Sequence, residues 1–243
     1  YELTPSLVGS EMCIRDRPEA MGEVLAQRDR IAEIADRHAP ARRHWAVVGS
    51  GPNLVAAREI RIKLSELCYK SISADATEDK KHIDLSAEPL ILVCATGLVG
   101  STADDVAKEV AIYRAHRAAP VVVADAGSSR FSEALDVVLV PMVHPRLSFI
   151  LSTMVGHLFG YEAARAIDAQ AQPLREAHAA IEREAVYLLS SEAEPGASVD
   201  GALHDELRLA ATAFSDELRN GRLNGHLEAS TACLLYTSPS PRD

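Results

Sequence analysis

The run PLILVCATG, residues 89–97, limits the possible folds of this chain more than any other feature. It is an almost continuous series of apolar residues, which is the pattern of a strand buried on both faces of a sheet. Similar runs occur at residues 44–51, 120–127 and 136–143, and a shorter strand is expected at residues 71–74. Segments of helical periodicity separate these runs. The sequence therefore predicts an α/β fold with a doubly wound parallel sheet of about five strands.

Apolar residues at helical spacing predict the helices between and after these strands. The predicted helices span residues 19–37, 53–70, 103–116, 146–167 and 203–218. The last one is amphipathic and ends before Asn220-Gly221, a typical stop signal. We expect three structural units, namely an N-terminal helix at residues 18–43, the sheet domain at residues 44–180, and a helical appendage or linker at residues 181–232.

Both termini are interpreted as translated adapter DNA. The tail CLLYTSPSPRD is what one reading frame of a transposon adapter used in sequencing libraries encodes. The reverse complement of the same adapter encodes LVGSEMCIRD near the N-terminus. We therefore expect residues 1–17 and 233–243 to be adapter-derived artefacts, and the part between them to be a fragment of a longer protein.

Composition and charge exclude several classes of function. The formal net charge of −10 argues against nucleic-acid binding, which needs clustered Lys and Arg. No apolar run approaches the roughly 20 residues that span a bilayer. Outside the adapter-like ends the only cysteines are Cys68 and Cys94, both in apolar segments, which predicts free thiols in a reducing, cytoplasmic compartment. No Cys/His spacing predicts a metal site.

Glycine-rich turns follow the predicted strands, and parallel sheets bind ligands at these carboxyl ends. The turn GSGPN contains Gly49, Ser50 and Gly51 and lies between a strand and a helix, where backbone N–H groups favour an anion. It lacks the third glycine of a dinucleotide-binding motif. A phosphate site and a plain strand-to-helix turn both remain open for it.

The segment GSTADD, residues 100–105, follows the run at residues 89–97. The hydroxyls of Ser101 and Thr102 can cap the following helix. They can equally bind a sugar phosphate together with Thr96.

The helix REIRIKLSELCYK, residues 58–70, has an unusual distribution of charge. Glu59, Lys63, Glu66 and Lys70 form one narrow line, which we call the charged stripe, between apolar residues on both sides. The simple interpretation is two i,i+4 ion pairs, each worth about 0.3–0.5 kcal/mol. The alternative is a carboxylate held partly away from water beside a lysine, which is how a general base is tuned.

From Trp45 to about Ala180 the sequence resembles a sugar isomerase (SIS) domain, and more narrowly the second SIS domain of the glutamine:fructose-6-phosphate aminotransferases, the glucosamine-6-phosphate synthase family. The resemblance runs from the GSG turn through AAREIRIKLSELCY to KKH. It implies a flavodoxin-like sheet. Within the family helix Leu-Glu-Gly-Ala-Leu-Lys-Leu-Lys-Glu-Ile-Ser-Tyr, the charged residues match Glu59, Lys63 and Glu66.

The resemblance also implies residue roles. Glu66 is expected to be the base that moves a proton between C1 and C2 of the sugar, with Lys63 assisting at the sugar oxygens. His82 is expected to help open the ring of a sugar bound by a neighbouring subunit. The family lysine that forms a Schiff base aligns with His178, which cannot form an imine and is kept as a substrate-contact candidate. The family loop Gly-Pro is Ile83-Asp84 here.

The sequence therefore predicts a sugar-phosphate isomerase domain of a glutamine:fructose-6-phosphate aminotransferase-like enzyme, without a cofactor. The expected partners are a sugar phosphate, a second copy in a homodimer, and the glutaminase and first SIS domains of the same polypeptide. The fragment is expected to be inactive alone. The alternatives are a non-catalytic phosphosugar-binding module and a purely structural dimerisation module.

Overall fold

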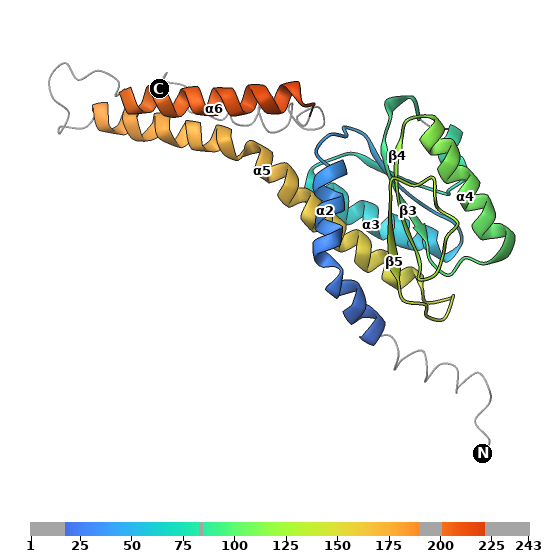
Figure 1. Cartoon of the computed structure of the whole chain (residues 1–243). Helices are drawn as coiled ribbons and strands as arrows, with labels where there is room; N and C mark the ends of the chain where they lie inside the picture. Colours follow the sequence, from blue (N-terminus) through green and yellow to red (C-terminus); the bar gives the residue numbers. More distant parts are fainter. Residues whose placement is uncertain (1–17, 83–84, 190–200, 222–243) are drawn as a thin grey trace.

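A five-stranded parallel sheet lies at the centre of the molecule in the computed structural model of the chain (Figure 1). The structure describes residues 18–82, 85–189 and 201–221. The strand order is β2-β1-β3-β4-β5, and every neighbouring pair is parallel. The strands are β1 (Trp45–Gly49), β2 (Ile72–Asp75), β3 (Leu90–Ala95), β4 (Ala119–Asp125) and β5 (Asp136–Val140). The predicted doubly wound α/β sheet is confirmed.

Helices cover both faces of this sheet. On one face lie α2, α3 and the first half of α5, and on the other lies α4 (Figure 1). Residues 18–26 are also helical. The remaining elements are α2 (Arg28–His38), α3 (Pro52–Cys68), the 3-10 helices η1 (Asp79–His82) and η2 (Leu85–Ala87), α4 (Gly100–Ala115), α5 (Phe149–Leu189) and α6 (Gly201–Arg219).

Two hydrophobic cores, one on each face, explain why the strand sequences are apolar at successive positions. Val47 and Val121 belong to the core under α2, α3 and α5. Their chain neighbours Val48 and Val122 belong to the core under α4. All four are almost completely buried. A strand with only one buried face would alternate apolar and polar residues, so the pattern of this sheet follows from its being covered twice.

The contact between α3 and α5 depends on two glycines four residues apart. A Cβ atom at Gly156 would lie 2.4 Å from Ile60 Cγ1, and one at Gly160 would lie 3.0 Å from Leu64. The Cys68 thiol reaches the carbonyl oxygen of Gly160 at 3.6 Å. Because glycine has no side chain at these points, the two helices approach closely over their buried faces.

The N-terminal helix is interrupted, which differs from the predicted continuous helix at residues 19–37. Gln27 is a turn residue between the helical residues 18–26 and α2. Its amide Nε2 donates to the carbonyl oxygen of Leu139 at 2.9 Å, beside the end of β5. The interruption thus lies at a contact between residues 112 positions apart, of which helical periodicity carries no sign.

The helix α5 is much longer than the predicted helix at residues 146–167. It continues through Pro173 to Leu189 and crosses residue 180, the expected end of the sheet domain, without interruption. Its second half leaves the sheet and pairs with α6, so that a two-helix arm projects from the domain (Figure 1). No residue of α6 is fully buried. The predicted C-terminal helical region is therefore present as this arm.

No helix in the described part of the chain is both long enough and apolar enough to cross a membrane. The adapter-like segments at residues 1–17 and 233–243 lie outside the described residues, as do Ile83 and Asp84.

Candidate functional site

Five strand ends meet at one edge of the sheet, which we call the carboxyl edge. Parallel pairing brings these ends together; Gly49, for example, is level with Cys94 across β1 and β3. Four glycines near this edge have positive φ angles, which residues with side chains rarely adopt. They are Gly51, Gly97, Gly100 and Gly127. The chain therefore turns sharply after β1, β3 and β4, and the predicted glycine-rich turns do lie at this edge.

The GSG turn (residues 49–53) leads from β1 into α3. The N-cap of α3 is Gly51, which gives no side-chain hydrogen bond to the helix. A Cβ atom at Gly49 would lie 2.4 Å from the carbonyl oxygen of Asn53, so the turn tolerates only glycine there. Ser50 donates its hydroxyl hydrogen to Thr77 Oγ1 at 3.1 Å, which ties the turn to the chain after β2.

The β3–α4 loop (residues 96–100) lies beside the GSG turn. The N-cap of α4 is Val99, which provides no side-chain cap, and Ser101 and Thr102 lie inside the first turn of the helix, exposed. The interpretation of these two hydroxyl residues as helix caps is therefore wrong. The first N–H groups of α4, like those of α3, have no side-chain acceptor at the N-cap, and this geometry suits an anion.

Thr96 is buried, with 1% of its surface exposed, and belongs to a hydrogen-bonded network with Asn53 and Ser152. Asn53 Nδ2 donates to the carbonyl oxygen of Thr96 at 2.7 Å, and the Thr96 hydroxyl donates to Asn53 Oδ1 at 3.1 Å. The Ser152 hydroxyl lies 2.9 Å from that of Thr96. The side chain of Thr96 is thus used inside the protein, below the surface of the carboxyl edge.

Asp125, at the end of β4, holds the same loop from the other side. Its Oδ2 atom accepts a hydrogen bond from the backbone N–H of Gly97 at 2.7 Å. Burial raises the pKa of Asp125, and the Gly97 N–H opposes this shift. A Cβ atom at Gly97 would lie 2.2 Å from Ser148 Oγ, so the loop is also in close contact with the chain before α5.

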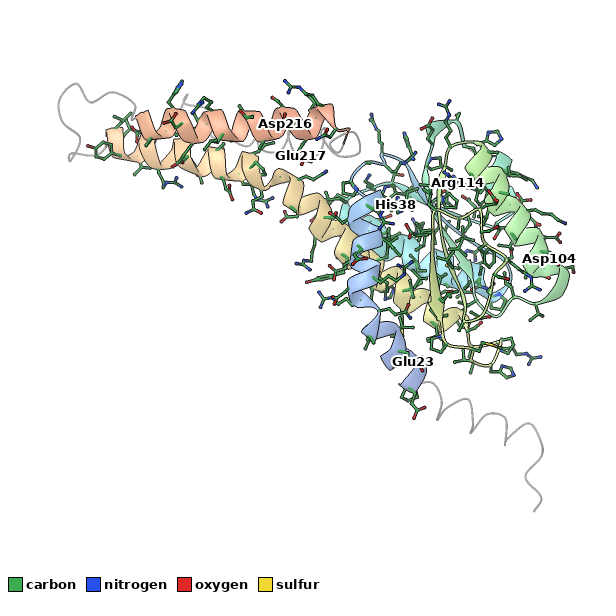
Figure 2. The ribbon with its side chains drawn as sticks, in the orientation of Figure 1. Glu23, His38, Asp104, Arg114, Asp216 and Glu217 are labelled. Carbon is green, nitrogen blue, oxygen red and sulfur yellow. The ribbon has the colours of Figure 1, made fainter. Side chains whose placement is uncertain are left out.

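An exposed ion pair links α4 to the turn after β4. Arg130 Nε lies 2.9 Å from Asp104 Oδ1. Figure 2 shows Asp104 near the first turn of α4 and Arg114 near the opposite end of that helix. Arg130 is therefore a cation at the carboxyl edge, and its partner Asp104 follows Thr102 by two residues in α4.

The charged stripe lies on the outer surface of α3. Lys63 Nζ and Glu66 Oε2 form an ion pair at 2.9 Å, and the side chains are 42% and 56% exposed. The pKa of Lys63 is raised by this hydrogen bond and by the charge of Glu66. Glu59 Oε1 lies 3.5 Å from Nε2 of His157 on α5. The stripe therefore pairs as Lys63–Glu66 and Glu59–His157, unlike the predicted i,i+4 pairs.

Only one side of the charged stripe is shielded. The apolar residues Ile60, Leu64 and Cys68 are buried beneath α5 and the sheet. On the other side Ile62 is 40% exposed and Tyr69 is 89% exposed. Shielding from water on both sides was predicted. Within one chain, one side of the stripe is shielded and the other is open to solvent.

Lys70 leaves the charged stripe because α3 ends at Cys68 and Tyr69 adopts a left-handed conformation. Its ammonium group donates to the carbonyl oxygen of Arg42 and lies 4.6 Å from the centre of the Trp45 ring. The pKa of Lys70 is lowered to about 7, mainly by burial; Cys68 opposes this shift and the charge of Arg43 adds to it.

The backbone of His82 ends η1, which two lysines connect to neighbouring elements. Lys80 is buried and lies 3.3 Å from Ser73 Oγ and 4.0 Å from Asp75 Oδ2 on β2. Lys81 pairs with Glu109 of α4 at 2.5 Å. Both pairs fix η1 between β2 and α4.

The predicted site residues fall into three separate groups. Gly49, Ser50, Gly51, Thr96, Ser101 and Thr102 gather at the carboxyl edge. Glu66 lies fourteen residues after Pro52, about 20 Å along α3 from that edge. His178 lies on the arm half of α5, where it pairs with Glu182 at 3.6 Å, about 40 Å along the helix from Ser152.

Sequence reasoning missed the residues that support the carboxyl edge from below. Asn53 was visible within GSGPN, where a polar residue in the first turn of a helix after a buried strand is a usable signal. Ser152 and Asp125 gave no such signal, because their roles depend on contacts with residues 56 and 28 positions away.

The sequence is related to that of a known enzyme over more than half of its length. It is 30% identical over 155 residues to glutamine–fructose-6-phosphate aminotransferase [isomerizing] of Thermus thermophilus. The match includes 62% of this chain but only 25% of the relative, so the chain spans about a quarter of that protein. No protein-family model matches the chain.

Solved structures share the fold at lower identity. The C-terminal domain of glucosamine-fructose-6-phosphate aminotransferase from Francisella tularensis superposes with a TM-score of 0.55 at 17% identity, covering 62% of this chain and 43% of that one. The sugar isomerase domain of the RpiR transcription factor from Sphaerobacter thermophilus gives a TM-score of 0.51 at 17% identity, covering 72% and 98%. These likenesses concern the fold.

Proposed function

We propose, from the premise that the chain carries a sugar isomerase (SIS) domain, that this protein binds a sugar phosphate at the carboxyl edge of its sheet. The observation that supports the proposal most strongly is the 30% identity to an enzyme whose name gives fructose 6-phosphate as its substrate. The GSG turn and the β3–α4 loop provide N–H groups for the phosphate, with the hydroxyls of Ser101 and Thr102 beside them. Thr96 supports these loops from below through its buried hydrogen bonds to Asn53 and Ser152.

A thermal-shift titration of the full chain with fructose 6-phosphate and glucosamine 6-phosphate tests this proposal. A ligand at 100 times its dissociation constant stabilises the folded state by about 2.7 kcal/mol, which raises the melting temperature measurably. Replacing both Ser101 and Thr102 by Ala is expected to reduce the shift. The matched control replaces Thr212 and Ser215 on α6 by Ala. Among the described residues their hydroxyls bond within their own helix, so this control should leave the shift intact.

Inorganic phosphate and fructose, tested separately, show which part of the ligand is recognised. A folded sample that no sugar phosphate stabilises would contradict the proposal and favour a purely structural SIS module.

The second candidate function is proton transfer between C1 and C2 of a ketose phosphate, as in an aminotransferase of amino-sugar metabolism. It is favoured by the Lys63–Glu66 ion pair and by the Glu59–His157 contact, which place a carboxylate, an amine and an imidazole along one surface. Glu66 would be the base, Lys63 its electrostatic partner, Glu59 a further polar contact and His82 the ring-opening group. We keep His178 in this proposal as a substrate contact supplied by another subunit, because within one chain it lies on the arm.

Proton transfer at the charged stripe requires protein surfaces that the described part of the chain does not provide. The charged stripe is about half exposed, and its Glu66 lies some 20 Å along α3 from the carboxyl edge, farther than one hexose phosphate extends. We therefore propose that a second copy in a homodimer covers the stripe. Glutaminase and first SIS domains of the same polypeptide would supply the nitrogen donor and another phosphate site.

Exchange of the sugar C1 and C2 protons in deuterated water, followed by NMR, distinguishes the two functions. If the stripe is catalytic, Glu66→Gln lowers the exchange rate by about 100-fold or more while binding persists. Glu176→Gln, at an exposed glutamate of α5, is the control. Binding by a homodimeric wild-type chain without any exchange would support the non-catalytic binding module for this chain.

A further inference from the structure

The deepest polar group at the carboxyl edge is the network of Asn53, Thr96 and Ser152. Each of the three belongs to a different element, namely α3, the chain after β3, and α5. Their side chains are almost inaccessible, with exposures of 2%, 1% and 0%. A buried polar network is stable only when its members satisfy one another, and these three do.

The hydrogen bonds of Asn53 run between the two loops of the proposed site. Its backbone N–H donates to the carbonyl oxygen of Ser50 at 3.2 Å, inside the GSG turn. Its side-chain amide holds both the carbonyl oxygen and the hydroxyl of Thr96, where the β3–α4 loop begins. One residue thus connects the start of α3 with the approach to α4.

Ser152 adds the third point of support. Its hydroxyl lies 2.9 Å from that of Thr96 and 3.4 Å from Asn53 Oδ1. One turn earlier, Ser148 contacts the position of Gly97 so closely that no side chain fits there. Ser148, just before α5, and Ser152, in its first turn, therefore support the β3–α4 loop at two points.

We propose that Asn53, Thr96 and Ser152 are positioning residues, which hold the GSG turn and the β3–α4 loop at one fixed separation so that a single sugar phosphate contacts both. This inference rests on the proposed function. Neither α3 nor α4 has a side-chain cap at its N-cap residue, so both ends can donate N–H groups to one anion only if their separation is fixed. The three side chains lie beneath the loops and act through them.

The test compares three threonine variants of the full chain. Thr96→Val removes the shared hydroxyl at nearly constant volume, and Thr96→Ser restores it. Thr153→Val is the matched control, because the Thr153 hydroxyl donates only to the carbonyl oxygen of Phe149 in its own helix. Fructose 6-phosphate affinity is measured by calorimetry, and stability by urea unfolding.

We expect Thr96→Val to weaken binding about tenfold or more, Thr96→Ser to bind nearly as the wild type does, and Thr153→Val to leave affinity unchanged. A Thr96→Val protein that is folded and binds as tightly as the wild type overturns the inference. So does an equal loss of affinity in Thr153→Val, since the effect would then follow stability alone.

A measurement without ligand separates this inference from the proposed function. In nitrogen-15 NMR spectra, Thr96→Val is expected to shift the amide signals of Gly49 and Gly51 across the network, whereas Thr153→Val is not. If those signals move but no sugar phosphate binds the wild type, the loops are coupled and the proposed ligand is wrong. If they do not move, the positioning role is wrong whatever the ligand.

Discussion

Lys70 fits the helical spacing of the charged stripe in the sequence, but in the structure its side chain lies outside the stripe. Its spacing from Glu66 fits an ion pair, yet α3 ends two residues earlier and the amine turns towards Trp45. There the aromatic face and the carbonyl oxygens of Arg42 and Arg43 surround it. These groups favour the ammonium form, whereas burial opposes it more strongly and lowers the pKa to about 7.

This lowered pKa predicts a pH dependence of stability. Between about pH 7 and 10 the unfolded chain binds a proton at Lys70 that the folded chain does not, so the free energy of unfolding rises with pH in this window. Below pH 7 the cost of burying the charge is fully present. Lys70→Met should remove this contribution. Urea unfolding at pH 7 and pH 9.5 should show a smaller gain for Lys70→Met than for the wild type, and equal gains would contradict the assignment.

At the scale of elements, the contact between α3 and α5 depends on space as much as on hydrophobic burial. Gly156 and Gly160 leave room for Ile60 and Leu64, so α5 lies against the back of the helix that carries the charged stripe. The same approach brings His157 beside Glu59. The close approach of α3 and α5 therefore fixes one flank of the stripe.

Two glycine-to-alanine substitutions are expected to have opposite effects. Gly156→Ala places a methyl group 2.4 Å from Ile60 and should destabilise the protein by about 1–3 kcal/mol, the usual cost of overpacking. Gly22→Ala, in the helical residues 18–26 with no atom within 4 Å of the new Cβ, should stabilise it by about 0.5–1 kcal/mol. Chemical denaturation measures both, and a neutral Gly156→Ala would show that the helices can separate at little cost.

Sequence patterns predicted elements better than they predicted the ends and contacts of elements. The predicted strands were correct because a strand that is buried on both faces has apolar residues at successive positions, as β3 does. The break at Gln27 and the length of α5 were missed; they coincide with contacts to Leu139 and to α6, which leave no local pattern in the sequence. Pro173 also reads as a helix end, although α5 continues past it.

The candidate site, too, could be predicted where the sequence carries a local pattern and not where it depends on contacts between distant residues. The glycine turns were found because their conformations require glycine, as at Gly97 and Gly100. The buried support from Asn53 and Ser152, and the pairing of Glu59 with His157, depend on how helices pack and leave no local pattern. The roles of Glu66, Lys63 and His82 stay predictions.

At the scale of the whole molecule, the protein consists of a well-packed domain and a thinly packed arm. Every residue of β3 is buried, whereas α6 has no fully buried residue. Figure 2 shows Asp216 and Glu217 on α6, at the end of the arm that is nearer the domain. Exposed apolar side chains on the arm include Ile181 and Leu209.

This contrast predicts a gradient of local stability. Amide hydrogens of α6 should exchange with solvent through openings of low free energy, at least about 100-fold faster than those of β3. Hydrogen-exchange mass spectrometry of the full chain measures the difference. Comparable protection in α6 and β3 would show that another surface covers the arm.

The helix α5 gives this arrangement a mechanical property. Its first turn holds Ser152 below the carboxyl edge, and the same rod continues eighteen residues beyond Ala171 to Leu189, about 27 Å outside the domain. A tilt of about 10° at the base would move the far end by about 5 Å. The helix is thus a lever whose short end lies beneath the proposed ligand and whose long end pairs with α6, with Pro173 as the point along it where bending costs least.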